Sequence, residues 1–335
     1  MFQIERCIRL KKILICDTAL CSANLGDEII LDSIYQNMDE IFSQGTTMRI
    51  ATHVENFNFL QMLRRNEKVR FCQNADWKFI CGSNLLTQKK IGKINGQWMI
   101  NPVNASVYSN SIFVGVGATK GNIKMDAYAT MLYKKVLSKT FYHSVRDNQS
   151  KKMVESLGCK AINTGCPTLW GLTPEVCEQI PVHKAKNCVL TVSGFPNQRS
   201  FDEDARMLSI ILKNYDKVWA WIQTIADEEY LKTLPGNESI IRIYTLKAYR
   251  DVLKQGDVDY IGTRLHGGVF ALQNGVRSLV ISIDHRADGF HKSNNLPILK
   301  RANITDGLEE IINNDLRTEI YLDQKSIARF KDQFK

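Results

Sequence analysis

Residues 259–272 read DYIGTRLHGGVFAL, and this stretch decides the fold class of the protein. Residues 259–262 are typical of a buried β-strand. Apolar residues return at helical spacing after Gly268, and we expect Gly267 and Gly268 to let the backbone turn between the two elements. The stretch therefore predicts a strand, a short loop and a helix, which is the repeating unit of an α/β protein.

The predicted loop combines a cation with a titratable ring. Arg264 and His266 come at the start of the predicted helix, where unpaired backbone N–H groups and roughly half a positive charge favour an anion. A guanidinium can add a bidentate clamp on a phosphate or carboxylate, and an imidazole can exchange a proton near neutral pH. We therefore predict an anion site in which Arg264 and Gly267 bind and His266 acts on the bound ligand.

Apolar runs alternate with helical patterns along the whole chain, which implies parallel sheets. Because 335 residues exceed what one core usually holds, we predict a Rossmann-like domain over residues 1–175 and a second over 176–335. Ligands of such sheets bind at the carboxyl ends of the strands, so we expect the two domains to face a cleft. The predicted strands are residues 11–16, 48–51, 79–82, 111–117, 140–146, 187–192, 218–222, 240–244, 260–262 and 278–283.

Composition limits the function classes. The formal net charge is +9, which favours an anionic partner, but the basic residues are spread and no nucleic-acid-binding signature occurs, so we expect no nucleic acid partner. Nine Cys residues show neither a Cys-x-x-Cys pair nor a Cys/His group for zinc. We expect reduced thiols, no metal site and a cytoplasmic protein. No stretch is apolar for long enough to cross a membrane, and no secretory signal is expected.

Two further strand-to-helix junctions carry polar residues. The first is NLGD at residues 24–27, and the second is RDNQS at residues 146–150. Asp27 falls in a first helical turn, where a carboxylate complements the helix dipole, so simple capping is an equal alternative to a function. Arg146 is either a surface arginine or a binding residue, and we expect Asp147 or Asn148 to cap the helix that follows.

Two glycine-containing turns are weaker candidates. Gly82-Ser83-Asn84 follows a predicted strand, and Ser83 is a candidate binding residue, although an ordinary tight turn is equally compatible. Residues 115–121 read GVGATKG. They lack the Walker spacing, and Lys120 stands where the third glycine of a dinucleotide fingerprint belongs, so we expect no nucleotide motif there.

Together, the three junctions resemble the polysaccharide pyruvyl transferase family. The family pattern combines an early Asn-x-Gly-Asp, a central Arg-Asp-x-x-Ser and a late Arg-Leu-His-Gly that opens an alanine-bearing helix. This chain shows all three in that order, and the likeness continues through ISIDHR at residues 281–286 and Gly289-Phe290. It spans about residues 13 to 290.

The resemblance implies a pair of domains like those of GT-B glycosyltransferases. It also implies that pyruvate passes from phosphoenolpyruvate onto two hydroxyls of a sugar, which gives a pyruvate ketal and releases phosphate. That donor carries a carboxylate and a phosphate, so its site needs at least two cations. Arg146 and Arg264 match the family motifs, and Arg286 is a further candidate.

The resemblance also assigns roles to single residues. His266 matches the motif histidine, and we expect it to be the general acid that protonates the methylene carbon of the donor. Asp27 is a candidate base for the sugar hydroxyl. The other expected substrate-binding residues are Asn24, Gly26 and Gly267 of the motifs, together with Ser83 of the turn that follows the predicted strand at residues 79–82. We expect no cofactor besides the donor substrate, and the resemblance does not fix the oligomeric state.

The acceptor implied by the resemblance is a saccharide, which in such pathways is often lipid-linked at the inner face of the membrane. The positive charge and a predicted helix at residues 325–331 are compatible with peripheral contact with the membrane, although a plain surface helix is the alternative. The chain has Val276-Arg277 where many relatives have Val-Pro, and the loop after Gly117 lacks their Gly-Pro ending. We expect these departures to leave the donor site intact, and they leave the identity of the acceptor open.

Two other functions fit the same pattern. A glycosyltransferase that uses a nucleotide sugar would share the domain plan and the phosphate sites at helix termini. A lectin-like or assembly protein could keep the scaffold without catalysis. The identity of the released product, phosphate or a nucleoside diphosphate, separates the two enzymes.

Overall fold

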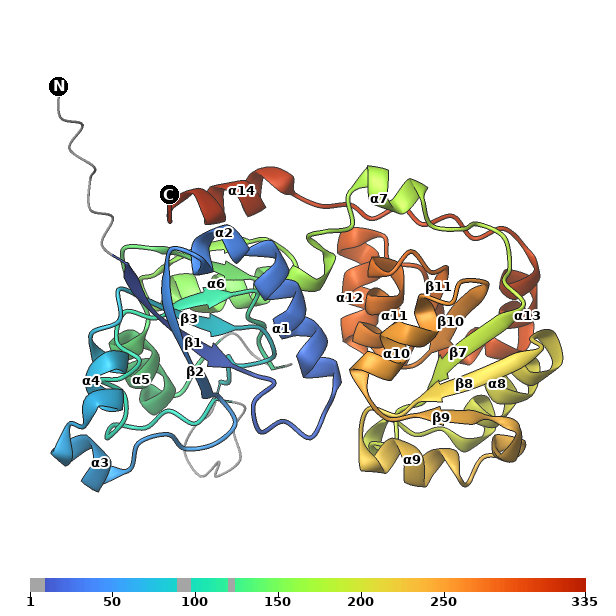
Figure 1. Cartoon of the computed structure of the whole chain (residues 1–335), viewed down its shortest axis with the longest axis horizontal. Coiled ribbons are helices and arrows are strands. Elements are labelled where there is room, and N and C mark those ends of the chain that lie inside the picture. The colour runs from blue at the N-terminus through green and yellow to red at the C-terminus, as the bar shows by residue number, and fades with distance from the viewer. Residues whose placement is uncertain (1–9, 89–97, 120–123) are drawn as a thin grey trace. The chain divides into compact units, whose positions relative to one another are not determined.

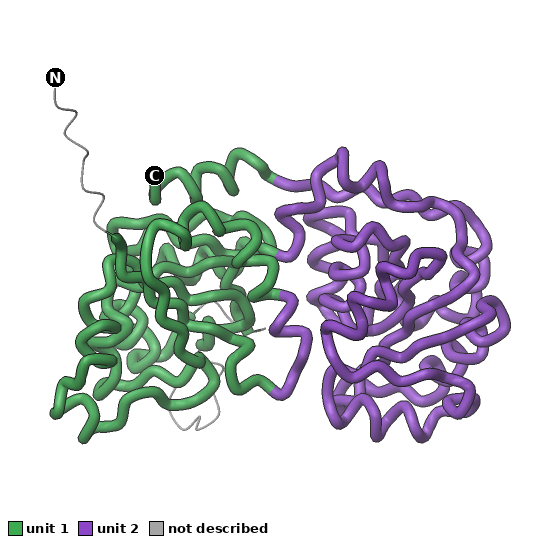
Figure 2. The backbone as a smooth tube through the Cα atoms, in the orientation of Figure 1, with its two compact units in different colours: residues 1–22, 30–167, 323–335 green, residues 23–29, 168–322 purple. Residues whose placement is uncertain are grey.

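The computed structural model describes residues 10–88, 98–119 and 124–335 (Figure 1). They form two compact units: unit 1 contains the described residues within 10–22, 30–167 and 323–335, and unit 2 contains residues 23–29 and 168–322 (Figure 2). The sequence suggested a single boundary near residue 175. The structure instead exchanges two segments: residues 23–29 cluster with unit 2, and the last helix returns to unit 1. The hydrophobic pattern of a segment predicts whether it forms a helix or a strand, but not which of the two hydrophobic cores it packs against.

Unit 1 contains a parallel sheet of order β2-β1-β3-β4. Strands β5 and β6 form a separate parallel pair. A single parallel bridge between Val116, just after β4, and Val145 of β5 connects this pair to the edge of the sheet. The strand order reverses between β1 and β3, as in flavodoxin-like sheets. The strands are β1 (Lys11–Asp17), β2 (Gly45–Ala51), β3 (Trp77–Cys81), β4 (Ile112–Val114), β5 (Tyr142–Val145) and β6 (Lys160–Asn163).

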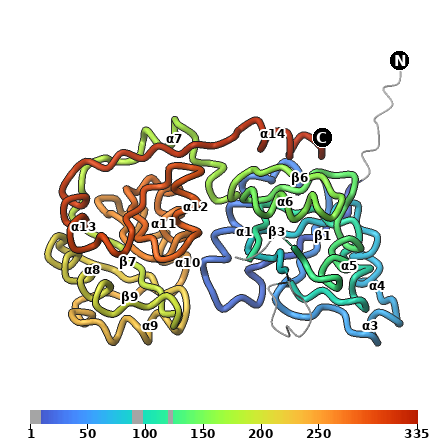
Figure 3. The backbone as a smooth tube through the Cα atoms, turned by 180° about the vertical axis from the view of Figure 1, so that it is seen from behind, coloured from blue at the N-terminus to red at the C-terminus, as the bar shows by residue number. Residues whose placement is uncertain are grey.

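Helices cover both faces of the unit 1 sheet. Residues of α4, α5 and α6 join the strands in one buried cluster that includes Phe113 and Leu132, and Figure 3 shows these helices from behind. On the other face, the ring of Phe79 contacts Phe42 and Phe334 at centroid distances of 5.5 and 5.1 Å. The helices are α1 (Gly26–Asn37), which belongs to unit 1 from Ile30 on, α2 (Asp39–Phe42), α3 (Phe59–Arg64), α4 (Glu67–Gln73), α5 (Ala127–Val136), α6 (Asn148–Ser156) and α14 (Gln324–Asp332).

Unit 2 contains a six-stranded parallel sheet of order β12-β11-β10-β7-β8-β9. Numbered within the unit, this is the Rossmann order, in which the first and fourth strands are neighbours. Its strands are β7 (Asn187–Thr191), β8 (Lys217–Trp221), β9 (Ile241–Ile243), β10 (Val258–Gly262), β11 (Ser278–Ser282) and β12 (Ile298–Lys300). β10 and β11 are buried along their whole length, as expected for strands covered on both faces.

Two groups of helices cover the unit 2 sheet. One face packs on α8, α9 and α13 in a cluster that includes Leu208 and Leu308. On the other face, Tyr249 of α10 stacks on Trp221 of β8 at a centroid distance of 4.3 Å. The helices are α7 (Pro174–Glu178), α8 (Phe201–Asn214), α9 (Ile225–Leu231), α10 (Leu246–Leu253), α11 (Leu265–Gln273), α12 (His285–Asn294) and α13 (Ile304–Asn313), and 3₁₀ turns span η1 (Pro167–Leu169), η2 (Pro196–Gln198), η3 (Asn237–Ser239) and η4 (Arg301–Asn303).

Every strand predicted from the sequence overlaps a strand of the structure, whereas β6 and β12 were not predicted. β6 has four residues and β12 has three, and runs this short do not by themselves show the alternation of a strand. The eight cysteines of the described ranges are all free thiols, as predicted. No helix in those ranges combines the length and the apolar character that a membrane span requires.

The C-terminal helix is part of the unit 1 core. Ile327 and Phe330 of α14 and Phe334 beyond it are buried, and the carbonyl of Phe334 accepts a hydrogen bond from Gln44 at 3.5 Å. The apolar side of α14 is therefore already covered by protein. A membrane contact through this helix would have to use its basic side chains.

Candidate functional site

The strand order of unit 2 reverses between β7 and β10, which lie side by side. Ligands of doubly wound sheets bind at such a point, outside the carboxyl ends of the strands. Thr191 ends β7 and Gly262 ends β10, and these two residues are register partners. The Arg-Leu-His-Gly motif at residues 264–267 follows β10 directly. It therefore lies at the point where the topology of unit 2 favours a ligand.

Hydroxyl groups hold the beginning of α11 on the sheet. Thr191 Oγ1 accepts the backbone N–H of Arg264 at 3.1 Å, and the hydroxyl of Tyr260 donates to the carbonyl of Arg264 at 2.7 Å. The hydroxyl of Tyr249 donates to the carbonyl of Gly267 at 2.8 Å. These bonds use groups at the two ends of the motif, so the backbone between them is fixed by side chains from α10, β7 and β10.

Gly267 and Gly268 lie inside α11 and not in the turn before it, which corrects the role predicted for them. A Cβ on Gly268 would approach the side chain of Val280 to 2.5 Å, and one on Gly267 would lie 2.9 Å from the hydroxyl of Tyr260. The two glycines therefore let α11 pack closely on the sheet. The chain reverses before them, at the extended N-cap residue Arg264.

Arg264 forms a buried ion pair with Asp227. Its Nη2 contacts Asp227 Oδ1, and its Nε donates to Oδ2 at 3.1 Å, while the two side chains are 8% and 1% exposed. Asp227 also accepts the backbone N–H groups of Gly194 at 2.7 Å and Thr224 at 3.2 Å. The ring of Phe195 lies 4.6 Å from the guanidinium carbon. A buried pair needs such additional bonds, and here they fix the direction of Arg264.

His266 is the second residue of α11, and its side chain is half-buried. Its ring lies edge to face with Phe290 of α12 at a centroid distance of 6.5 Å. The N-cap of α11 makes no side-chain hydrogen bond to the helix, so the first turn directs N–H groups and the positive end of the dipole toward the loop. An imidazole at this position is suited to proton transfer with an anionic ligand.

The early motif packs with unit 2 through Gln223. The N–H of Leu25 donates to the carbonyl of Gln223 at 3.2 Å. Asn24 Oδ1 accepts the N–H of Gly26 at 3.1 Å, and the carbonyl of Asn24 accepts that of Asp27 at 3.0 Å, which forms the turn before α1. The side chain of Asp27 is half-buried. The structure therefore brings the early and the late motif together in one unit.

Arg286 pairs with Asp284, the N-cap of α12. Asp284 accepts the backbone N–H of Arg286 at 2.9 Å and its Nη2 at 2.7 Å, and Gln198 donates to the same carboxylate at 3.3 Å. Burial raises the pKa of the Asp284 carboxyl, but the hydrogen bonds and charge of Arg286 outweigh it, so the pKa lies below its ordinary value. Arg286 keeps 32% of its side chain exposed, so its charge can act on a ligand at this edge.

Arg146 and Ser83 meet in unit 1. The guanidinium of Arg146 lies on Gly117, where a Cβ would be 2.2 Å from Arg146 Nε, and its Nη2 contacts Asn84 Oδ1. The carbonyl of Ser83, which has a positive φ of 58°, accepts the N–H of Gly117 at 2.8 Å. The loops after β3, β4 and β5 thus form one polar cluster, and Gly117 is needed because the guanidinium fills the space that a side chain would take.

Some of these partners had a signal in the sequence and others had none. Thr224-x-x-Asp227 is a capping box directly after a strand, and both its bonds are present at the start of α9, so this pair could have been predicted. Asp147 caps α6 by accepting the N–H of Ser150 at 2.7 Å, as predicted. No sequence pattern indicates that Asp227 holds Arg264, because the two residues meet only when β8 and β10 join one sheet.

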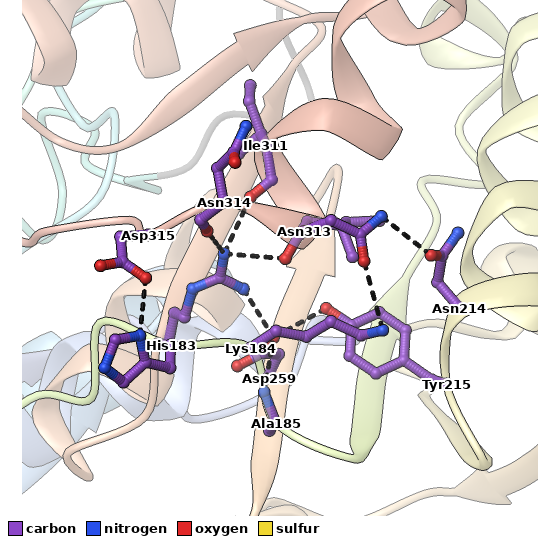
Figure 4. A network of polar contacts seen from close by, with 12 residues as sticks. His183, Lys184, Ala185, Asn214, Tyr215, Asp259, Ile311, Asn313, Asn314 and Asp315 are labelled. Atoms are coloured by element: carbon purple, nitrogen blue, oxygen red, sulfur yellow. Dashed lines mark hydrogen bonds and ion pairs between the residues drawn. The ribbon is translucent and has the colours of Figure 1, made fainter.

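Arg277, at the departure from the family pattern, lies at the opposite end of the strands. Its Nη1 donates to Asp259 Oδ2 at 2.7 Å, and its Nη2 donates to the carbonyls of Ile311 at 2.8 Å and Asn314 at 2.8 Å. Tyr215 donates to the same carboxylate at 2.7 Å, and Figure 4 shows this network. Arg277 therefore closes the end of α13 within the core, and this departure does not alter the carboxyl edge at which the late motif lies.

Comparison with known proteins identifies the family. The family model for polysaccharide pyruvyl transferase matches residues 24–285. The chain belongs to the polysaccharide pyruvyl transferase family. The match begins at Asn24 and continues past the late motif, so it contains all three motifs on which the resemblance was based. The predicted family is confirmed, and it implies a transferase of polysaccharide biosynthesis with a saccharide acceptor. No curated protein shows a significant sequence match.

Solved structures support the fold. UDP-N-acetylglucosamine 2-epimerase of Methanocaldococcus jannaschii is similar at a TM-score of 0.53 and 12% identity, over 96% of this chain and 98% of that chain. The enzyme of the same name from Rickettsia bellii gives a TM-score of 0.50 and 10% identity, over 97% and 94%. Similarity at this level of identity concerns the fold alone. It confirms the predicted fold class, Rossmann-like α/β domains of the GT-B type.

Proposed function

We propose that this family member transfers pyruvate from phosphoenolpyruvate to two hydroxyls of one saccharide, which forms a ketal and releases phosphate. The observation that carries the proposal is the position of the Arg-Leu-His-Gly motif at the switch point of unit 2, in a chain that matches the family over residues 24–285. A helix start, a fixed guanidinium and an imidazole suit a small donor with two anionic groups.

The proposed chemistry begins with His266. It donates a proton to the methylene carbon of the donor, and the double-bond electrons form the new C–H bond. The neighbouring carbon becomes an oxocarbenium-like centre, which the first sugar hydroxyl attacks with loss of its proton. The C–O bond to phosphate then breaks, and the second hydroxyl closes the ketal. The two sugar hydroxyls lose two protons in total. One of them makes up for the proton that His266 gave to the new methyl group, and the other leaves with the released phosphate.

In unit 2, the pair with Asp227 uses Nε and Nη2 of Arg264, so Nη1 is the atom proposed to contact the donor, and the partly exposed Arg286 is proposed to add a second charge. Asp27 is proposed as the base for a sugar hydroxyl. Arg146 belongs to unit 1, and its role in donor binding stays a prediction.

We also propose that the acceptor is lipid-linked and is modified at the cytoplasmic face of the membrane. The net charge of +9 supports this, because anionic lipid surfaces attract basic proteins. Sedimentation with vesicles that contain an anionic lipid, compared with neutral vesicles, tests the membrane contact. Equal recovery with both vesicles would contradict it.

The direct test supplies phosphoenolpyruvate with candidate glycans and measures phosphate and product mass. The expected product gains one pyruvate and loses one water. Replacing His266 by Gln should lower turnover by about 10² to 10⁴ while the fold is kept. His183, an exposed residue paired with Asp315, provides the control His183→Gln, which should retain activity. Release of a nucleoside diphosphate from a nucleotide sugar, without ketal formation, would replace the proposal by a glycosyltransferase.

A further inference from the structure

Gln223 links the two motifs of unit 2, although neither motif contains it. It follows β8, and its backbone carbonyl accepts the N–H of Leu25 from the early motif. Its side-chain Oε1 lies 2.9 Å from the position that a Cβ would take on Gly26. Its Nε2 lies 3.1 Å from the corresponding position on Gly267. The carboxamide therefore lies between the two glycines, with its donor nitrogen toward the first turn of α11.

The donor nitrogen of this side chain is buried without a partner. Gln223 is 4% exposed, and among residues 10–88, 98–119 and 124–335 no hydrogen-bond acceptor meets its Nε2. A buried N–H group that lacks an acceptor is unfavourable, and nearly all such groups in folded proteins are paired. The next residue along the chain, Thr224, caps α9 together with Asp227, so the backbone that carries Gln223 is fixed.

The start of α11 provides matching groups. The helix has nine residues, its N-cap Arg264 makes no side-chain cap bond, and its first turn contains Gly267. Backbone N–H groups at such a terminus favour an anion. The unpaired Nε2 of Gln223 points to the same turn, so two independent sources of N–H groups converge there.

We propose that Gln223 Nε2 and the first turn of α11 form a subsite for an oxyanion of the donor, and that Gln223 is a substrate-binding residue. The inference rests on the proposed function for the identity of the donor. A carboxylate and a phosphate both supply the oxygen that Nε2 lacks. The subsite would keep one end of the donor fixed while His266, in the same turn, acts on the neighbouring carbon.

Binding to the full chain tests the subsite independently of catalysis. Titration calorimetry with phosphoenolpyruvate, inorganic phosphate and pyruvate is compared for the wild type, Gln223→Met and Gln223→Glu. Methionine keeps the length of the side chain and removes the donor, so phosphoenolpyruvate should bind about 10- to 100-fold more weakly. Glutamate keeps the shape and adds a like charge, so it should weaken binding further. Gln255→Glu, which adds the same charge at an exposed position of unit 2, is the control and should bind normally.

The probes also identify the oxyanion. If only phosphate binding weakens in Gln223→Met, the subsite holds the phosphate; if only pyruvate binding weakens, it holds the carboxylate. Urea midpoints check folding, and Gln223→Glu carries the test if Gln223→Met is unstable. Unchanged binding of all three probes in both variants, or no binding by the wild type, would overturn the subsite. If the wild type binds phosphoenolpyruvate but forms no ketal, the proposed function fails while the subsite stands.

Discussion

Unit 2 contains two buried Arg–Asp pairs at opposite ends of its strands, and we expect them to serve different purposes. Arg264–Asp227 lies at the carboxyl edge, with side chains 8% and 1% exposed. Arg277–Asp259 lies at the other edge, with side chains 4% and 2% exposed. Burial and ion pairing therefore do not separate them. The difference is that Arg277 also donates to carbonyls at the end of α13, whereas Arg264 adjoins a helix start and a histidine.

This contrast shows how to distinguish a functional charge from a structural one. The guanidinium of Arg277 is used to close a helix C-terminus, where a cation is favourable. The guanidinium of Arg264 is held in place by Asp227 and Thr224, yet the helix beside it has no side-chain cap. We expect a charge that completes its surroundings, as that of Arg277 does, to stabilise the fold. We expect a charge fixed beside a helix start without a side-chain cap, as that of Arg264 is, to serve a ligand.

The largest expected difference is in catalysis. Arg264→Lys keeps the charge but cannot reproduce the two-bond contact with Asp227, so kcat/KM should fall by about 10²-fold. Arg277→Lys should keep kcat/KM close to that of the wild type, because its pair lies at the other edge. Rates of phosphate release at a temperature where both variants are folded measure the difference. Similar losses in both variants would remove the distinction drawn between the pairs.

The second prediction concerns stability. Arg277→Met leaves the carboxylate of Asp259 buried without its cation and should lower the free energy of unfolding by about 3–5 kcal/mol. The double variant Arg277→Met/Asp259→Leu removes both charges and should recover much of that loss. Urea denaturation of both proteins is the measurement. A double variant no more stable than the single one would show that the charge of Asp259 is not the cause.

The third prediction concerns the pH dependence of stability, which we expect to depend on a buried histidine of unit 1. Burial lowers the pKa of His143 to about 4, and its ring accepts the N–H of Phe113 at 3.1 Å and donates to the carbonyl of Ser138 at 2.8 Å. Because the folded pKa lies below the value of about 6.5 in the unfolded chain, its stabilisation is present above pH 6.5 and is lost as pH falls toward 4, by up to about 3 kcal/mol.

Urea midpoints between pH 4 and 7 measure this loss. His143→Gln should flatten the pH dependence of unfolding, because the buried imidazole that must take up a proton is gone. If this variant titrates like the wild type, another group is responsible for the acid sensitivity.

The smallest expected effect is at Phe195. Its ring is 36% exposed and lies 4.6 Å from the guanidinium carbon of Arg264, a contact worth about 0.5–1 kcal/mol at an exposed site. Phe195→Leu should therefore lower kcat/KM by about two- to five-fold with little change in urea midpoint. A loss as large as that of Arg264→Lys would mean that the ring contacts the substrate itself.

Much of the fold could be predicted because its signals are local. The strand at β10 and the helix at α11 follow from apolar spacing within residues 259–272, and the capping residue Asp147 acts within its own helix. The exchange of α14 into unit 1 could not be predicted, since Phe330 and Phe334 would fit any apolar surface. The contacts of Arg277 could not be predicted, because the family pattern gives its place in the chain and not the end of the strand at which it lies.

The sequence by itself determined the alternation of strands and helices, the family and the chain positions of Arg146, Arg264 and His266, because these depend on spacing and residue type. Only the tertiary structure decided that Asp227 fixes Arg264, that Gln223 lies between two motif glycines and that Gly117 makes room for Arg146. Such contacts join residues far apart in the chain, and they exist only when parallel strands bring their carboxyl ends to one edge of a sheet.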